Sequence, residues 1–142
     1  MLRTRGSWAA VLVTAAASCG ALAGAAPAAD AGPSARTVAV TLSEWKLVAS
    51  ATSVPSGRVT FRVANAGHLG HEFVVLRSER HHHALPTAGG RAKEAGRLGK
   101  LPRLQAGETR TLTLRLRPGK YVLLCNLLGH YRAGQYSALR VR

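Results

Sequence analysis

Four side chains in two short segments of the sequence could together bind a metal ion. Cys125 is followed by His130 five residues later and by Gln135 five residues after that, and His71 lies in a separate segment upstream. A thiolate, two imidazole nitrogens and a weak oxygen donor form the ligand set of a mononuclear blue-copper centre. The sequence therefore predicts a site for one copper ion, held by His71, Cys125, His130 and Gln135.

Each of these residues also has a less specific interpretation, and the sequence alone leaves it open. Cys125 could be a buried apolar thiol, as free cysteines often are. His71 could be a buried, hydrogen-bonded histidine, and His68 competes with it as a ligand three residues earlier. His130 could simply pack the loop, and Gln135 could turn away to leave three ligands. Zinc accepts the same cysteine and histidine donors, although the loop spacing favours copper.

The first 29 residues have the order of a secretory signal peptide. Arg3 and Arg5 precede a short apolar run at 8–17, and small residues follow it. A run of this length is too short to span a bilayer, which takes about 20 apolar residues. We therefore expect residues 1–29 to be removed on export, at a cleavage site that the sequence does not fix, and the protein to be periplasmic or extracellular.

The sequence contains two cysteines, and we expect only Cys125 to belong to the folded part. Cys19 lies in the leader, with Ala16 at the position where a lipoprotein signal has a leucine-like residue. If Cys19 is lipidated, the protein is tethered to a membrane; otherwise Cys19 leaves with the signal. An exported domain with a single thiol has no internal disulfide, and a bare thiol is a liability in an oxidising compartment. Metal ligation would protect Cys125.

Short segments with alternating apolar residues recur through the rest of the chain. They lie at 37–42, 45–50, 58–63, 72–77, 110–116, 121–125 and 136–141. After a flexible lead-in at 30–36, these seven or eight short strands predict one domain at 37–142 with an all-β, antiparallel sandwich fold. The segment 78–105 interrupts the strands as an irregular excursion, in which Ala92–Leu98 could form one or two helical turns.

The chain is strongly basic, with a formal net charge of +14. Without the two arginines of the leader, 18 Lys and Arg remain against six Asp and Glu. Such a surface favours encounter with an acidic redox protein or with an anionic membrane surface. Export and the lack of a motif that combines aromatic and basic residues argue against nucleic acid as a partner.

Two segments of the sequence resemble the cupredoxins, in particular the small exported single-domain copper proteins of bacteria. They read Asn65-x-Gly67-x-x-x-His71-Glu72-Phe73 and Cys125-Asn126-Leu127-Leu128-Gly129-His130-Tyr131-x-x-Gly134. The resemblance covers about residues 37–142, and it implies a Greek-key β-sandwich that binds one copper ion cycling between Cu(II) and Cu(I). It also implies that His71 begins a strand, that Cys125 closes the penultimate strand, and that His130 lies on the loop into the last strand.

The residue after Gly134 departs from the family pattern. Cupredoxins usually have methionine there as the axial ligand, whereas this chain has Gln135. An amide oxygen is a harder donor than a thioether and favours Cu(II). By resemblance to the stellacyanin type, we expect Gln135 to be the axial ligand and to lower the reduction potential.

Other residues are expected to support or extend the site. We expect Asn65 to brace the ligand loop through side-chain hydrogen bonds, and Asn126 to cap its own loop or to hydrogen-bond near the thiolate. The consecutive histidines His81, His82 and His83 form either a solvated loop or an accessory tract that binds metal loosely.

Together these features predict an exported one-electron carrier that acts as a monomer and has no small-molecule substrate. The exposed edge of His130 would pass the electron. The alternative is a copper-binding or copper-delivery protein with the same ligands, towards which Gln135 and the three consecutive histidines lean. A metal-free interaction module is a third possibility, against which the intact ligands argue. We do not expect an enzyme, because the acidic residues are few and scattered and no Ser/His/Asp arrangement is suggested.

Overall fold

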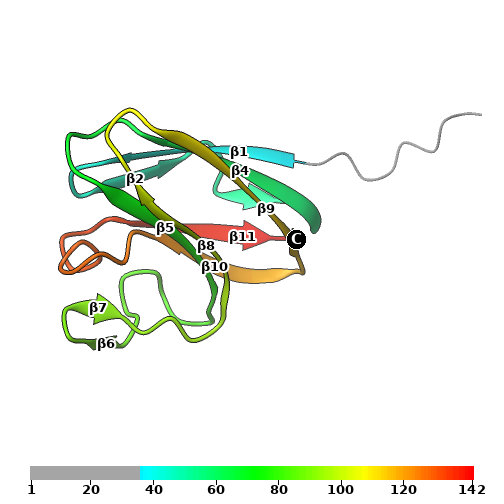
Figure 1. The fold of residues 1–142 in the computed structure, drawn as a ribbon. Coiled ribbons are helices and arrows are strands. Elements are labelled where there is room, and N and C mark those ends of the chain that lie inside the picture. The colour runs from blue at the N-terminus through cyan, green and yellow to red at the C-terminus, as the bar shows by residue number, and fades with distance from the viewer. Residues whose placement is uncertain (1–35) are drawn as a thin grey trace, which may run out of the picture. The chain divides into compact units, whose positions relative to one another are not determined.

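The computed structural model describes residues 36–142, which form two facing β-sheets and a small ribbon (Figure 1). The first sheet has the order β2 (Lys46–Ala49), β1 (Arg36–Ser43), β4 (Gly57–Asn65) and β9 (Thr109–Leu116). The second has the order β3 (Ser53–Val54), β11 (Tyr136–Val141), β10 (Gly119–Leu124), β5 (His71–Arg77) and β8 (Arg97–Leu104). The ribbon consists of β6 (Thr87–Ala88) and β7 (Arg91–Ala92).

The predicted signal peptide at 1–29 and all but the last residue of the predicted lead-in lie outside the described residues. Within residues 36–142 there is no helix long and apolar enough to cross a membrane.

The core between the two sheets follows from the alternation of side chains along each strand. On β4, Val59, Phe61 and Val63 are buried, whereas the side chains between them face outward. Phe61 meets Phe73 of β5 across the core, with ring centroids 5.4 Å apart. The predicted all-β sandwich is therefore confirmed, and its core consists of the apolar residues that the alternation indicates.

The sheets are mixed, because two pairs of strands run parallel within them. β1 pairs with β4 in parallel, and β11 pairs with β3 in parallel, while the other pairs are antiparallel. Two neighbouring strands can be parallel only where a longer connection than a hairpin joins them. The alternation of apolar residues does not reveal which strands become neighbours.

The predicted helical turn at Ala92–Leu98 is wrong, and the irregular excursion is shorter than predicted. Residues 97–104 form β8, which pairs with the edge of β5 through two register shifts. Those bulges break the alternation of buried residues, and the leucines at 98, 101 and 104 are spaced three apart, as on a helix. The irregular part therefore ends at residue 96.

The predicted ligand segments meet at one end of the sandwich, which we call the site end. β1 and β4 finish there at Ser43 and Asn65, and β5 begins there at His71. β10 finishes beside β5, because Leu124 pairs with Val74 in the antiparallel register. The residue after β10 and the first residue of β5 are therefore brought close together by the sheet itself.

Replacing Phe61 with alanine should lower the free energy of unfolding by about 3–5 kcal/mol, because it opens a cavity at the centre of the core. Urea titration of the purified protein measures this change. Arg62→Ala, on the outer face of the same strand, is the matched control and should change stability by less than about 0.5 kcal/mol. Equal effects of the two substitutions would contradict the assigned strand faces.

Candidate metal centre

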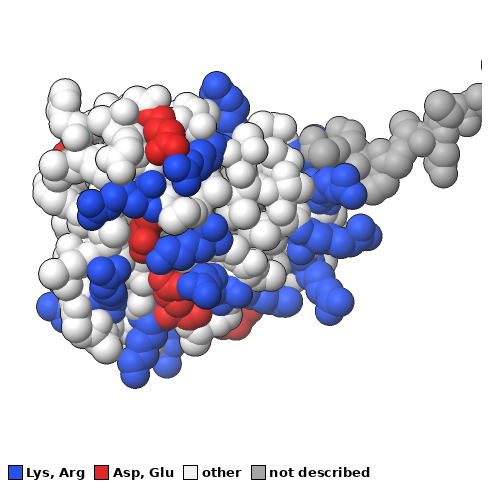
Figure 2. All heavy atoms as spheres, in the orientation of Figure 1, with Lys and Arg blue, Asp and Glu red and all other residues white. Residues whose placement is uncertain are grey.

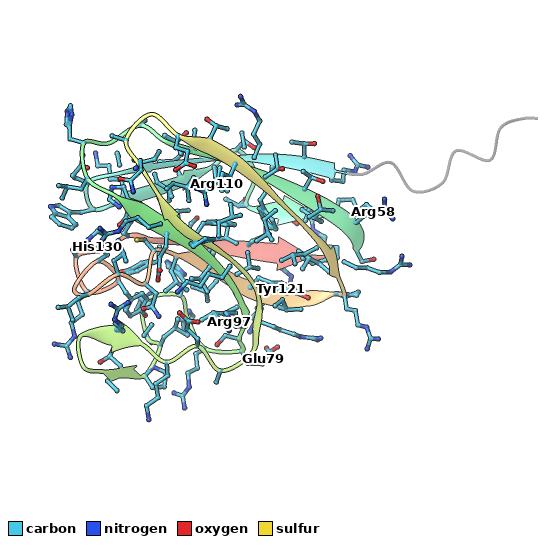
Figure 3. All side chains as sticks on the ribbon, in the orientation of Figure 1. Arg58, Glu79, Arg97, Arg110, Tyr121 and His130 are labelled. Carbon is cyan, nitrogen blue, oxygen red and sulfur yellow. The ribbon has the colours of Figure 1, made fainter. Side chains whose placement is uncertain are left out.

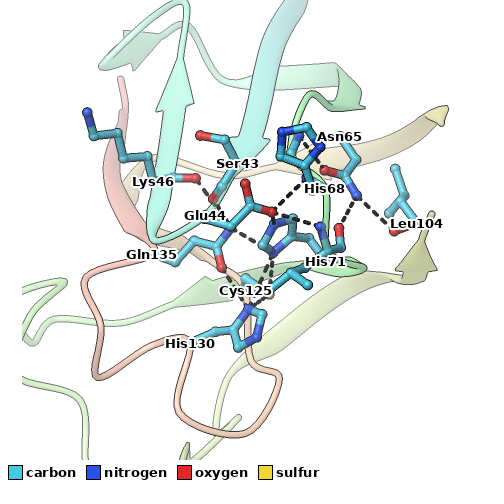
Figure 4. Close-up of polar contacts among 12 residues, drawn as sticks. Ser43, Glu44, Lys46, Asn65, His68, His71, Leu104, Cys125, His130 and Gln135 are labelled. Atoms are coloured by element: carbon cyan, nitrogen blue, oxygen red, sulfur yellow. Dashed lines mark hydrogen bonds and ion pairs between the residues drawn. The ribbon is translucent and has the colours of Figure 1, made fainter. Parts of the chain in front are cut away.

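Three of the predicted ligand side chains form one group at the site end (Figure 4). Cys125 Sγ lies 3.4 Å from His130 Nδ1 and 3.9 Å from His71 Nδ1, and the two Nδ1 atoms are 3.3 Å apart. Within residues 36–142 this is the one group of three or more His, Cys, Asp or Glu side chains whose donor atoms all lie within 4.8 Å of one another. His71 and Cys125 are fully buried, and His130 is partly exposed.

Backbone hydrogen bonds fold the segment from Cys125 to Gln135 into a closed loop. The Cys125 N–H donates to the Gln135 carbonyl at 3.0 Å and closes the loop at its base. Within the loop, the His130 N–H donates to the Leu127 carbonyl at 3.0 Å. Gly134 has a φ of 102°, a conformation that side chains rarely allow. The chain can therefore turn sharply and direct Gln135 back towards Cys125 and His130.

Gln135 is fully buried, and its amide has a defined orientation. Its Nε2 donates to the Ser43 carbonyl at 2.8 Å and to the Lys46 carbonyl at 3.3 Å. Because carbonyl oxygens only accept hydrogen bonds, the amide nitrogen must face them and Oε1 must face the other way. Oε1 lies 2.9 Å from His130 Nδ1, and Nε2 lies 3.0 Å from His71 Nδ1. An oxygen donor therefore lies beside the three clustered side chains.

The protonation of the buried Cys125 and His71 side chains follows from their surroundings. Burial raises the pKa of the Cys125 thiol, and the Glu72 N–H, which donates to Sγ at 3.3 Å, opposes this rise. Burial also lowers the pKa of His71 below its ordinary value, so its ring is neutral at neutral pH. A neutral imidazole offers a lone pair to a metal ion, and metal binding would displace the thiol proton.

Glu44, which the sequence analysis did not single out, holds the ligand loop before β5 in place. Its Oε1 accepts hydrogen bonds from the N–H groups of His68 and Leu69, both at 2.8 Å, and lies 3.3 Å from His71 Nε2. The hydrogen bond from the Leu69 N–H is the main cause that lowers the pKa of Glu44 to about 2. One carboxylate thus fixes the far side of the His71 ring and directs Nδ1 towards Cys125.

Trp45, the neighbour of Glu44, was predicted to begin a strand but lies in the turn between β1 and β2. Its φ of 64° is unusual for a bulky residue. Its ring packs edge-on against the ring of His130, with centroids 5.0 Å apart. Trp45 is 47% exposed, and its ring covers part of His130, the one clustered side chain that reaches the surface.

Asn65 and Asn126, predicted to support the ligands, both use their side chains to hold loops. Asn65 Nδ2 donates to the carbonyls of Leu69 and Leu104 at 2.8 and 3.0 Å, and its Oδ1 accepts from the Gly67 N–H at 2.9 Å. The hydrogen bonds of Asn65 therefore brace the loop before β5.

The side chain of Asn126 points towards the ribbon and makes its hydrogen bonds there. Its Oδ1 accepts from the Ala92 N–H at 2.8 Å, and its Nδ2 donates to the Ala92 carbonyl and to Glu94 Oε1, both at 2.9 Å. Asn126 thus joins the excursion between β5 and β8 to the ligand loop.

The remaining histidines lie outside the group of clustered donors. His68 is exposed, and only its backbone N–H contacts the site. The rings of His81 and His83 stack with centroids 5.4 Å apart, but the tract forms no group of donors within 4.8 Å in the described chain. The Tyr131 hydroxyl donates to the His82 carbonyl at 2.9 Å, which attaches the tract to the ligand loop.

The clustered donors fit a copper ion. A sulfur and two imidazole nitrogens suit copper in both oxidation states, and a weak oxygen is a known fourth donor in such sites. Zinc would accept the same donors. The amide oxygen of Gln135 adds to the group without the charge that a carboxylate would bring.

Replacing Glu44 with glutamine should destabilise the metal-free protein at neutral pH and much less in acid. The pKa of Glu44 is about 2, below its ordinary 4.5. Its stabilisation is therefore fully present above about pH 4.5 and is lost as the pH falls towards 2. Urea titrations of both proteins from about pH 7 to about pH 3 measure the difference, with the exposed Glu79→Gln as control. A difference that does not change with pH would contradict this role.

No protein-family model matches the sequence, and no curated protein matches it. The fold, however, is similar to solved structures. Auracyanin from Roseiflexus castenholzii has a TM-score of 0.60 and 20% identity, over 76% of this chain and 98% of that chain. Auracyanin B has a TM-score of 0.60 and 25% identity, over 76% and 89%. Rusticyanin from Thiobacillus ferrooxidans has a TM-score of 0.60 and 16% identity, over 77% and 79%.

These similar structures are cupredoxins, and their likeness extends over nearly all of the described residues of this chain. The sandwich has the strands at whose ends such proteins are expected to place their ligands, and His71, Cys125 and His130 meet there. This chain therefore has the cupredoxin fold, with a buried His–Cys–His group at the end of its sandwich.

Proposed function

We propose that this chain is an exported type 1 copper protein that carries single electrons. His71, Cys125 and His130 would hold the copper, and Gln135 Oε1 would be a fourth, weak donor. The observation that carries the proposal is the buried group of one sulfur and two Nδ1 atoms at the end of a cupredoxin sandwich. Copper, when bound, supplies a one-electron couple between Cu(II) and Cu(I).

The protein's own part is to hold the ligands in one arrangement for both oxidation states. Cys125 and His71 stand at the ends of paired strands, and the Gln135 amide is fixed by two backbone carbonyls. The Glu72 N–H donates to the sulfur and stabilises the thiolate. Ligands that are fixed in this way move little when the charge at the site changes.

His130 is the ligand through which an electron would enter and leave. It is partly exposed, whereas His71, Cys125 and Gln135 are buried. Two residues before His130 in the same loop, Leu128 is 66% exposed and gives an apolar surface for close contact with a partner. Arg132 is exposed in the same loop and would favour an acidic redox protein.

Export is supported by the signal-like order of residues 1–29 and by the lone thiol of the described domain, Cys125. A copper-bound thiolate is protected in an oxidising compartment in which a bare thiol is not.

Adding Cu(II) to the purified protein should produce an intense visible band from charge transfer between the Cys125 thiolate and copper. The electron paramagnetic resonance spectrum should show one copper site. Cys125→Ser should lose the band, because a hydroxyl is a poor ligand in place of a thiolate. A weak spectrum that persists in Cys125→Ser would refute the proposed site.

Retention of copper then separates a carrier from a delivery protein, the alternative that the exposed histidine tract favours. A carrier should keep its copper through repeated reduction and reoxidation in the presence of a chelator. Release of copper on reduction would favour delivery.

Replacing Gln135 with methionine should raise the reduction potential, because a thioether is a softer donor than an amide oxygen and favours Cu(I). Potentiometric titration of the copper-loaded proteins measures the shift. Gln105→Met, in the exposed turn before β9, is the matched control and should leave the potential unchanged. An unchanged potential in Gln135→Met would show that the amide oxygen does not act on the copper.

A further inference from the structure

The end of the sandwich opposite the site end carries a concentrated group of exposed cations. β1, β4 and β10 begin there, and β5, β9 and β11 finish there. We call this end of the sandwich the basic end. The cations of the group are exposed and lie at or beside these strand ends: Arg36, Arg58, Arg77, Arg115, Arg117, Lys120, Arg140 and Arg142. Figure 2 shows Lys and Arg, and no acidic side chain, on the drawn face of this right-hand end; Figure 3 places Arg58 there and His130 at the opposite end.

Both sheets place like charges directly opposite each other at the basic end. Arg58 of β4 pairs with Arg115 of β9 in register. Lys120 of β10 pairs with Arg140 of β11 in register. Like charges in such positions destabilise a sheet. These cations therefore do not serve the stability of the fold, and an anionic surface against them would relieve their repulsion.

The acidic side chains of the described chain leave this group almost entirely uncompensated. Glu79 is the one that contacts it, 3.6 Å from Lys120 Nζ and largely exposed. The other ion pairs within residues 36–142 join Glu44, Glu72, Glu94 and Glu108 to residues outside the group. Seven of the eight cations have no carboxylate partner in this part of the chain.

The basic end also lacks the apolar centre that protein interfaces usually have. Of the exposed large apolar side chains of residues 36–142, only Leu98, near the start of β8, lies beside the end of β5; Trp45, Val48, Leu69 and Leu128 belong to other segments. A protein partner would find few anchors among the eight cations. A diffuse anionic surface, which needs charge and no matching shape, suits the group better.

The covalent connection of the chain supports a membrane as that surface. Arg36 opens β1 at the basic end, so the 35 residues before it are joined to the domain at this end. They include Cys19, which would be the point of attachment to a membrane if it is lipidated. A chain attached to a bilayer through this segment would meet the bilayer with its basic end first.

We propose that the basic end binds the headgroups of an anionic phospholipid membrane, with the site end facing away from it. β4 runs between the two ends, and the eight steps of about 3.3 Å between its nine residues make it about 26 Å long. His130 would therefore stay free for a redox partner while the basic end lies on the membrane. This proposal uses a different surface from the copper site and does not depend on copper binding.

The test is binding of the purified protein to vesicles of phosphatidylcholine with and without phosphatidylglycerol, at low and at high salt. Each Lys or Arg near an anionic surface contributes about fivefold in affinity. The triple variant Arg58→Gln, Arg115→Gln, Arg117→Gln should therefore bind phosphatidylglycerol vesicles about a hundredfold more weakly. The triple variant Lys93→Gln, Arg103→Gln, Arg132→Gln removes the same charge from exposed positions elsewhere and should lose only a few-fold.

Equal losses in the two triple variants would overturn the proposal, because net charge alone would then explain binding. Absence of salt-sensitive binding to phosphatidylglycerol vesicles would also overturn it. If the basic end instead binds soluble polyglutamate and not vesicles, an acidic protein is the partner and the membrane proposal is wrong.

Trp45 reports the orientation, because it lies at the site end and the chain has one other tryptophan, Trp8. In Trp8→Phe protein, acrylamide should quench Trp45 fluorescence equally with and without bound vesicles. Protection of Trp45 by vesicles would show that the site end faces the membrane, which would refute the proposed orientation.

Discussion

The hydrogen bonds from Gln135 Nε2 to the carbonyls of Ser43 and Lys46 are the contacts on which the site depends. They join the last loop of the chain to the first hairpin and fix the side of the amide that faces the ligands. If they were absent, Oε1 and Nε2 could exchange places, and a hydrogen-bond donor would face His130 in place of an acceptor. The identity of the fourth donor is thus set by backbone atoms far away in sequence.

The same hairpin turn contacts both clustered histidines. Glu44 reaches the outer nitrogen of His71, and Trp45 packs on the ring of His130. A tryptophan with a φ of 64° costs roughly 1–2 kcal/mol relative to an ordinary conformation. The contact of its ring with His130 explains why this position has a large side chain where glycine would relieve the strain. Four consecutive residues therefore limit the movement of His71, His130 and Gln135 together.

The sequence predicts the parts of this arrangement that depend on local patterns. His71 and Cys125 could be found because each stands where an apolar strand begins or ends. β8 could not be found, because two bulges and leucines spaced three apart hide its alternation. Glu44 could not be found either: it acts on a loop 24 residues away, and only the pairing of β1 with β4 brings the two together. The orientation of the Gln135 amide could not be found from the sequence either, because the carbonyls of Ser43 and Lys46 that set it lie about 90 residues away.

The separation of charge along the sandwich allows its two ends to act independently. Glu44 contacts His71, and Glu72, the residue after His71, pairs with Lys100. Two of the five acidic side chains in residues 36–142 therefore stand at the site. The like-charged pairs Arg58–Arg115 and Lys120–Arg140 stand at the other end. Exposed charges are screened over about 8 Å at physiological ionic strength, and β4 is about 26 Å long. The basic end can therefore govern where the protein binds with little effect on the potential at Cys125: even Lys120, five residues before Cys125 along β10, is about 17 Å or two screening lengths away.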